Sequence, residues 1–266
     1  MSKIIMLGTA DATAGKSYNT CFVIENENNY FLVDTGCSNR VLDNLKYANI
    51  EISKIHNIFI SHKHMDHLLG LLWILRYITF LIKKNEYQGK LNIYCNEEVS
   101  TIIKSLYKML LRKSQADIID SFINIITVKD NETRNINGIN YTFFDAKSKE
   151  VDLFGFETII NNKKLVFLGD EKCNTENYDR IYNADYVMHE VFCLEKDKKS
   201  SGVGASVHSS VEDVVNKMNG KKIKNLILYH SKINDKIDKK YEFEKVGNKL
   251  FDGKVVVPND LEVIEI

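Results

Sequence analysis

The stretch Ser61-His62-Lys63-His64-Met65-Asp66-His67 decides the fold of this 266-residue sequence. It lies where an apolar run ending at Ile60 gives way to apolar residues spaced by three and four from Leu68 onward, which predicts a strand followed by a helix. Three of the chain's seven histidines lie in this stretch. Clustered imidazoles normally bind metal or take part in catalysis. We therefore interpret the stretch as a metal site rather than as a polar loop that happens to contain histidine.

The spacing within this stretch predicts two ion positions. In an extended segment, residues i and i+2 point to the same side, so His62 and His64 can converge on one ion. Asp66 and His67 lie at the expected turn into the helix, project at another angle and can hold a second ion nearby.

Two later positions offer further ligands at the ends of apolar runs. Asp170 follows Val166-Phe167-Leu168-Gly169, and His230 follows Leu226-Ile227-Leu228-Tyr229. An aspartate at a strand end is often only a turn former, and a histidine there is often only a surface residue. Because the same placement occurs twice, we interpret both residues as ligands of the same site.

Runs of β-branched and aromatic residues, separated by polar or glycine-containing segments, are typical of strands. They occur at residues 4–7, 21–24, 30–33, 55–60, 141–144, 156–160, 165–168, 186–188, 226–228, 255–257 and 263–264. Helical patterns cover residues 68–82, 97–113 and 210–218, and residues 161–164 indicate a hairpin turn. This mixture of strands and helices predicts an α/β or α+β fold.

The composition predicts one globular domain over residues 1–266, because 44% of the residues are hydrophobic and the single proline marks no linker. The formal net charge is zero, so the sequence predicts no general attraction to nucleic acid or to a membrane surface. The most apolar run, residues 68–82, is shorter than the roughly 20 residues that span a bilayer. The five cysteines form no C-x-x-C pair and no export signal precedes them, so we expect reduced thiols and a cytoplasmic location.

These motifs resemble the metallo-β-lactamase fold superfamily, and within it the ribonuclease Z branch. Besides the predicted ligands, the resemblance rests on Met6-Leu7-Gly8-Thr9, Ser17-Tyr18-Asn19-Thr20 and Leu32-Val33-Asp34-Thr35-Gly36. It implies a four-layer αβ/βα sandwich, in which two mixed sheets lie face to face with helices outside and the metal ligands lie at one rim. It also implies that Asp34 orders the metal loop, that Asp170 bridges two ions, and that the protein forms a homodimer.

Two further segments are similar to a proton-transfer pair of the same branch. These are His189-Glu190, after a predicted strand, and His208-Ser209-Ser210, before a predicted helix. A carboxylate that hydrogen-bonds an imidazole raises its basicity and fixes its tautomer, so His208 could protonate a leaving oxygen while Glu190 orients it. The structural alternative is that His208 caps the helix and that Glu190 is a surface residue at a strand end.

The sequence departs from the family pattern at one ligand. That pattern has another metal histidine before the bridging aspartate, but no histidine occurs between His67 and His189. A lysine or Asp145, in the stretch of residues 144–149, must stand in, and a protonated lysine cannot bind a metal. The ion expected at His62, His64 and Asp170 is therefore the weaker one. The short span from residue 149 to residue 170 also leaves no room for the long arm with which ribonucleases Z hold tRNA, so tRNA is disfavoured as a substrate.

We therefore expect a metal-dependent hydrolase, most simply a phosphodiesterase that acts on RNA or on a small nucleotide. The expected cofactor is one or two Zn²⁺ ions, with Mn²⁺ and iron as alternatives. A metal-bound hydroxide would attack phosphorus, with catalytic roles for Asp66, Glu190 and His208. The predicted metal ligands are His62, His64, Asp66, His67, Asp170 and His230. The alternatives are hydrolysis of another ester, such as a lactone or thioester, and a non-catalytic paralogue that binds metal or nucleic acid.

Other motifs point to structural roles. Residues 10–17 fit the loose form of a phosphate-binding loop, but a strand rather than a helix is expected to follow them. Cys193 is expected to be a buried apolar thiol and Trp73 a core residue. The lysine-rich stretches 196–199, 221–224 and 232–240 are expected to be solvated surface.

Overall fold

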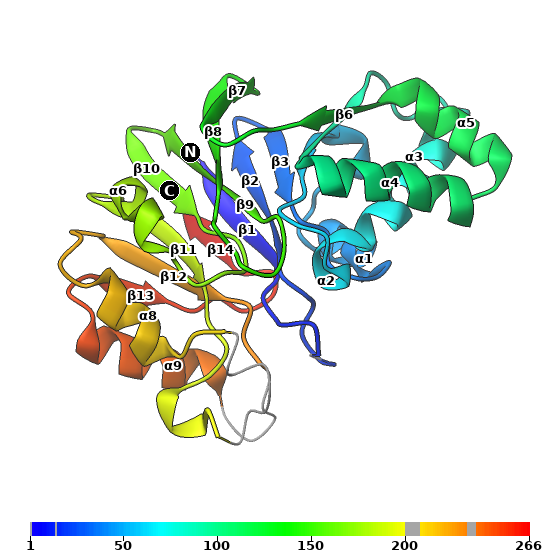
Figure 1. Cartoon of the computed structure of the whole chain (residues 1–266). Coiled ribbons are helices and arrows are strands. Elements are labelled where there is room, and N and C mark those ends of the chain that lie inside the picture. The colour runs from blue at the N-terminus through cyan, green and yellow to red at the C-terminus, as the bar shows by residue number, and fades with distance from the viewer. Residues whose placement is uncertain (1, 14, 200–207, 233–237) are drawn as a thin grey trace.

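Two seven-stranded sheets face each other in the computed structural model, which describes residues 2–13, 15–199, 208–232 and 238–266 (Figure 1). The first sheet has the strand order β14 (Val263–Glu265), β1 (Lys3–Gly8), β2 (Cys21–Asn26), β3 (Asn29–Val33), β4 (Ile55–Phe59), β5 (Leu91–Cys95) and β6 (Ile123–Thr127). The second has the order β13 (Lys254–Val256), β12 (Asn225–Tyr229), β11 (Tyr186–Glu190), β10 (Lys163–Phe167), β9 (Phe154–Ile160), β8 (Ile139–Asp145) and β7 (Glu132–Ile136).

The first sheet is buried on both faces, which explains why its strands are almost continuously apolar. In β1, Ile4 and Met6 join the core between the sheets, whereas Ile5 and Leu7 face the opposite core, beneath the helices. This is the two-residue alternation of a strand. The core between the sheets is rich in aromatic rings, which pack edge-on, tilted or stacked; Phe31 and Tyr141, for example, are tilted, with ring centroids 4.6 Å apart.

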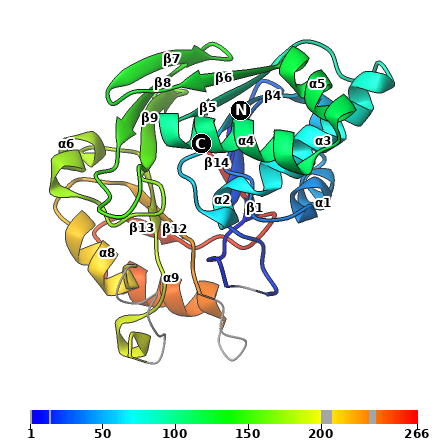
Figure 2. The same cartoon turned by 45° about the vertical axis from the view of Figure 1, so that its right-hand side comes forward.

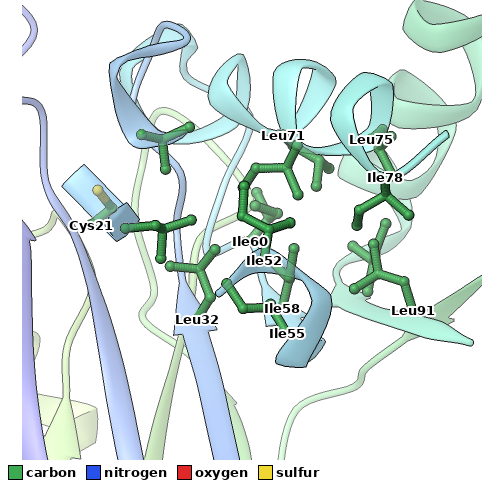
Figure 3. Packing of buried hydrophobic residues seen from close by; sticks show 14 of the residues in the cluster. Cys21, Leu32, Ile52, Ile55, Ile58, Ile60, Leu71, Leu75, Ile78 and Leu91 are labelled. Atoms are coloured by element: carbon green, nitrogen blue, oxygen red, sulfur yellow. The ribbon is translucent and has the colours of Figure 1, made fainter. Parts of the chain in front are cut away.

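Helices cover the outer face of each sheet (Figures 1 and 2). Those packed on the first sheet are α1 (Arg40–Tyr47), α3 (Gly70–Lys83), α4 (Glu97–Leu110) and α5 (Lys113–Phe122). Those on the second sheet are α6 (Tyr178–Ile181), α8 (Val211–Met218) and α9 (Lys239–Leu250). Figure 3 shows Leu71, Leu75 and Ile78 of α3 lying over side chains of the first sheet. The short helix α2 (Met65–Leu68) and the 3₁₀ turns η1 (Ile52–Lys54), η2 (Thr175–Asn177) and η3 (Glu195–Asp197) complete the assigned helical elements. The architecture is the predicted four-layer sandwich.

Parallel strands bring the predicted site residues to one rim. Strands β3 to β6 are parallel in the first sheet, and β10 to β13 are parallel in the second. Segments that leave the carboxyl ends of parallel strands emerge at the same edge of a sheet, where α/β proteins commonly bind ligands. The histidine stretch follows β4, Asp170 follows β10, and His230 follows β12.

A glycine allows helix α3 to approach this rim closely. The Gly70 N–H donates to the carbonyl of Gly36 at 2.8 Å. A Cβ atom at position 70 would lie 1.9 Å from the carbonyl oxygen of Thr35, so no other residue fits without moving the helix. The start of α3 is therefore fixed against the loop that follows β3.

The strands and helices predicted from the sequence are present, with two differences. The pattern over residues 97–113 runs past the end of α4, because the chain is extended at Leu111 and Arg112 before α5 begins. Helices α1, α5, α6 and α9 and strands β5 to β7 were not predicted. The hairpin turn is confirmed, since Asn161 and Asn162 join β9 to β10 with φ values of 50° and 61°.

Three side chains differ from the predicted burial. Trp73 is 39% exposed and lies on the outer surface of α3, so the prediction that it is a core residue is wrong. Lys221, expected in solvent, is only 8% exposed, and its ammonium group lies 4.1 Å from the centroid of the Tyr178 ring. Lys239 is half-buried, with its Nζ donating to Thr9 Oγ1 at 3.1 Å. A lysine-rich composition therefore does not place every lysine in solvent.

Among the described residues, one helical stretch, Met65–Lys83, is long and apolar enough to cross a membrane. Of its apolar window, 56% is buried inside the protein. Because core helices pass the same test, this is weak evidence for a membrane span.

Candidate metal centre and active site

Asp34, directly after β3, organises the histidine stretch. Its carboxylate accepts hydrogen bonds from the Ser61 N–H, the Ser61 hydroxyl and His67 Nδ1, each at 2.8 Å. Asp34 has a φ of 54°, a left-handed conformation that aspartate and asparagine tolerate better than most residues. Because Nδ1 of His67 donates to Asp34, its Nε2 presents a lone pair to the site. A carboxylate behind a metal-binding histidine has this effect in many metal sites.

A first group of ligands consists of Asp66, His67, Asp170 and His230, whose ligand atoms all lie within 4.8 Å of one another. His230 Nε2 lies 3.3 Å from Asp66 Oδ2, and His230 Nδ1 lies 3.0 Å from Asp170 Oδ1. His67 Nε2 lies 3.5 Å from Asp170 Oδ2. Three of these buried atoms, His67 Nε2, Asp170 Oδ1 and His230 Nδ1, make no hydrogen bond within the described part of the chain. Buried polar atoms that converge without partners fit a metal ion.

The electrostatics of this group also favour a cation. Burial by itself lowers the pKa of His67, but the carboxylates of Asp66 and Asp34 raise it well above its ordinary value. Burial opposes a positive charge on His230 as well, yet Asp170 and Asp66 raise its pKa to about 10. The carboxylates thus make this buried group of side chains stabilise positive charge, as the binding of a divalent cation requires.

A second group consists of His62, His64 and Asp170. The predicted i, i+2 convergence is present, since His62 Nε2 and His64 Nδ1 lie 2.9 Å apart. His62 is buried and its Nδ1 lies 3.0 Å from Ser61 Oγ, whereas His64 is exposed. Asp170 belongs to both groups and so occupies a position from which one carboxylate can bridge two ions.

The expectation that a lysine or Asp145 completes the second group is not met. Asp145 instead accepts hydrogen bonds from the N–H of Lys147 at 2.7 Å and from its Nζ at 3.0 Å. Lys147 Nζ also lies 3.7 Å from Asp130. Within the part of the chain that the structure describes, no other histidine, cysteine or carboxylate joins His62, His64 and Asp170. The first group therefore offers four ligands, and the second offers three.

Glu190 and His208 lie beside Asp170, the carboxylate that the two ligand groups share. Glu190 is fully buried, which excludes the alternative that it is a surface residue. His208 Nδ1 lies 3.4 Å from Glu190 Oε2 and 3.6 Å from Asp170 Oδ1. The Ser209 N–H donates to Glu190 Oε1 at 3.0 Å, so Glu190 also fixes the backbone beside His208. The residue that caps α8 is Ser210, not His208.

The two members of this pair shift each other's pKa. Burial lowers the pKa of His208, but the hydrogen bond to Glu190 and the charge of Asp170 raise it above its ordinary value. Burial raises the pKa of Glu190, but the hydrogen bond from His208 and the charges of His189 and His208 together outweigh this and lower it below its ordinary value. The arrangement favours an imidazolium beside a carboxylate, which is the form in which histidine can donate a proton.

Sequence reasoning missed two residues that shape this rim. The hydroxyl of Tyr229 donates to the Gly169 carbonyl, which places the residue before Asp170 against the end of β12. His189 is buried, its Nδ1 bonds the Glu190 carbonyl at 2.6 Å, and its Nε2 accepts from the Cys173 N–H at 3.1 Å. Neither role has a signal in the sequence, because both depend on which strand ends become neighbours.

Comparisons with known proteins place the chain in a family. A family model described as "Anti-Pycsar protein Apyc1" matches residues 2–250. Ribonuclease Z of Thermococcus sibiricus is 25% identical over 100% of this chain and 97% of that protein. Ribonuclease Z of Methanococcus aeolicus is 38% identical over 108 residues, which cover 40% of this chain and 32% of that protein.

Solved structures share the fold over the whole chain. The metallo-β-lactamase fold protein YhfI from Bacillus subtilis superposes with a TM-score of 0.80 at 16% identity, covering 100% of this chain and 99% of that one. Human tRNase Z, short form, superposes with a TM-score of 0.73 at 18% identity, with the same coverage. The resemblance to the metallo-β-lactamase superfamily and its ribonuclease Z branch is confirmed, and the chain is a metal-dependent hydrolase. Since the family model covers nearly the whole sequence, the chain belongs to the family described as Anti-Pycsar protein Apyc1.

Proposed function

We propose that the chain is a metal-dependent phosphodiesterase acting on nucleotides. The observation that carries the proposal is the meeting of three groups of side chains at Asp170: two sets of metal ligands and the Glu190–His208 pair. An ester of phosphoric acid needs charge neutralised at phosphorus and a proton supplied to the leaving oxygen. The metal ligands serve the first requirement, and the pair serves the second.

Zn²⁺ suits this site best, because imidazole nitrogens and carboxylate oxygens are its common ligands; Mn²⁺ and iron are the alternatives. Asp66, His67, Asp170 and His230 would hold the more tightly bound ion, and His62 and His64, with Asp170, would hold a second. When bound, such ions lower the pKa of a water ligand and withdraw charge from phosphoryl oxygens.

His208 donates the proton to the leaving oxygen in this proposal. Its Nδ1 faces Glu190 and Asp170, so the opposite ring nitrogen, Nε2, is the one available to a substrate. Glu190 holds the imidazole in place and stabilises its charged form. Asp66 acts as a ligand on which the ion's position depends, which is why its loss is expected to stop turnover.

A small nucleotide is the substrate class that the fold favours over tRNA. Strands β9 and β10 and their two-residue turn occupy most of the span from residue 149 to residue 170, where no long arm is inserted. A small nucleotide contains a phosphodiester when its phosphate is esterified to a second alcohol or phenol, as in a dinucleotide, or closed onto its own ribose. The family name further suggests that this hydrolysis serves an anti-Pycsar role.

The test is hydrolysis of bis(p-nitrophenyl) phosphate by metal-stripped protein titrated with Zn²⁺ or Mn²⁺. We expect turnover to return with metal and to be lost in Asp66→Ala while the fold is kept. Asp43→Ala, at an exposed site on α1, is the matched control. Metal-restored turnover would lead to dinucleotides, cyclic mononucleotides and short RNA as substrates. Near-normal activity of Asp66→Ala would contradict the assignment of the site, and activity only on lactones or thioesters would contradict the bond class.

A further inference from the structure

Phe192 lies against the imidazole that the proposed function uses as its acid. The rings of Phe192 and His208 are stacked, with centroids 5.4 Å apart and planes inclined by only 18°. The ring of His230 lies near His208 as well, at 5.0 Å and 46°. His208 thus has an aromatic neighbour on a ring face and two carboxylates at its Nδ1 edge.

Packing in the three large apolar cores does not explain why Phe192 is buried. Phe192 is 5% exposed, yet it belongs to none of the three large apolar cores, and among the described residues its buried apolar cluster contains only Cys193. Its side chain therefore adds little to the packing between sheets and helices. What it contacts instead is the ring of His208 and, at 5.7 Å from its centroid, the ammonium group of Lys232.

The backbone of Phe192 joins two segments of the site. Its N–H donates to the Ser209 carbonyl at 2.9 Å, next to His208, and its carbonyl accepts from the Lys232 N–H at 3.1 Å. These bonds do not depend on the side chain at position 192. A change of side chain therefore removes the stacked ring and leaves the backbone connection in place.

We propose that Phe192 is a positioning residue that fixes the plane of the His208 imidazole, so that Nε2 points at the leaving oxygen of the substrate. This inference rests on the proposed function. Glu190 and Asp170 face the Nδ1 edge of the ring, but contacts at one edge do not by themselves fix the plane of the ring. The stacked phenyl ring restrains this plane, and proton transfer depends steeply on such alignment.

The first test compares two leaving groups on one nucleotide. Thymidine 5′-(p-nitrophenyl phosphate) releases nitrophenolate, which needs no proton, whereas a thymidine dinucleotide releases an alkoxide, which does. We expect Phe192→Leu to lower kcat about tenfold on the dinucleotide, with KM nearly unchanged, and to have a much smaller effect on the nitrophenyl ester. Phe192→Tyr keeps the ring and should restore kcat on the dinucleotide.

A matched control separates positioning from loss of packing. Phe251→Leu removes a phenyl ring of similar burial, 7% exposed, from the core outside the second sheet. We expect it to lower the melting temperature without changing the ratio of the two rates. Equal losses on the two substrates in Phe192→Leu, or no rescue by Phe192→Tyr, would overturn the proposal.

The second test does not depend on activity. In the Zn²⁺-loaded protein, the ring current of Phe192 should shift the NMR signals of the carbon-bound His208 ring protons upfield. We expect this shift to vanish in Phe192→Leu and to remain in Phe192→Tyr. If the proposed phosphodiesterase activity fails but the shift behaves in this way, the stack stands and only the substrate is wrong. His208 signals that are the same in Phe192→Leu would overturn the inference itself.

Discussion

Asp34 shows how a residue that touches no substrate can set the affinity of a metal site. Replacing it with Asn keeps a side chain that tolerates its φ of 54° but removes the charge that holds Ser61 and His67. We expect Asp34→Asn to weaken Zn²⁺ binding about 10- to 100-fold, as losses of such supporting carboxylates do. Competition with a chromophoric chelator measures this. An unchanged dissociation constant, with Asp43→Asn as the control, would show that Asp34 does not orient His67.

Lys239 makes the stability depend on pH. Burial lowers its pKa from the ordinary value of 10.5 to about 8, although the charges of Asp260 and Asp11 oppose this. Between these two pH values the unfolded chain keeps a proton that the folded chain has released, so Lys239 makes the free energy of unfolding rise with pH. Below about pH 8 both states hold the proton, and the burial of the charge costs stability in full.

We therefore expect the stability of wild type relative to Lys239→Met to increase from pH 8 toward pH 10. Taking this difference cancels the groups that the two proteins share. Urea unfolding of both proteins at several pH values measures it. Parallel pH profiles, offset only by the lost hydrogen bond to Thr9, would contradict the shifted titration.

The site could be predicted from the residue types at strand ends. The burial of individual side chains could not, because it depends on the direction in which each side chain points. All six predicted ligands meet at one rim because each one is a metal-binding residue type in a segment that follows an apolar strand. Trp73 was placed wrongly because α3 is apolar on more than one face, so its spacing does not tell which residues face the sheet. The burial of Lys239 depends on contacts with distant segments, which composition does not contain.

At the scale of elements, the position of α3 depends on Gly70, which has no side chain. Adding a methyl group at Gly70 would bring it to 1.9 Å from the Thr35 carbonyl oxygen, so the helix must move away from the loop that holds Asp34. We expect Gly70→Ala to lower the melting temperature by about 5 °C or more, since overpacking costs about 1–3 kcal/mol. It should also weaken metal binding. Calorimetry with Gly15→Ala as control, where nothing lies within 4 Å, tests this; equal melting temperatures would contradict it.

The elements that flank the site were the predictable ones. Their apolar runs are long or end in distinctive residues, as in β4, β10 and β12. The unpredicted β6 and β7 are only partly buried strands at sheet edges, and their sequences therefore alternate weakly. Helix α4 was extended too far because residues 111 and 112 carry no glycine or proline to mark its end.

At the scale of the whole molecule, the metal ligands connect the two sheets. His62, His64, Asp66 and His67 follow a strand of the first sheet, whereas Asp170 and His230 follow strands of the second. An ion bound to both sets stabilises the folded chain by about 4 kcal/mol when its concentration is 1,000 times its dissociation constant. We expect a chelator to lower the melting temperature by about 10 °C, and Zn²⁺ to restore it. Identical melting curves with and without chelator would contradict an ion between the sheets.

The layered arrangement was predicted from the family resemblance and not from the periodicity of the sequence. Strand and helix patterns gave a mixed α/β or α+β class, and nothing in them orders seven strands in each of two sheets. The order is set by contacts between segments far apart in the sequence, such as the pairing of β1 with β14. The substrate is harder still to predict from the sequence, because it depends on the shape of the rim rather than on the metal ligands.

In the proposed function, both metal binding and hydrolysis depend on Asp170, and the Asp170→Asn variant tests this most directly. Metal content after equilibrium dialysis against Zn²⁺ and turnover of bis(p-nitrophenyl) phosphate are measured on the same sample. Asp179→Asn, on the exposed side of α6, is the control. We predict that Asp170→Asn loses most of its bound metal and its turnover together, while the control keeps both. An Asp170→Asn protein that binds metal and hydrolyses the diester like wild type would contradict the account.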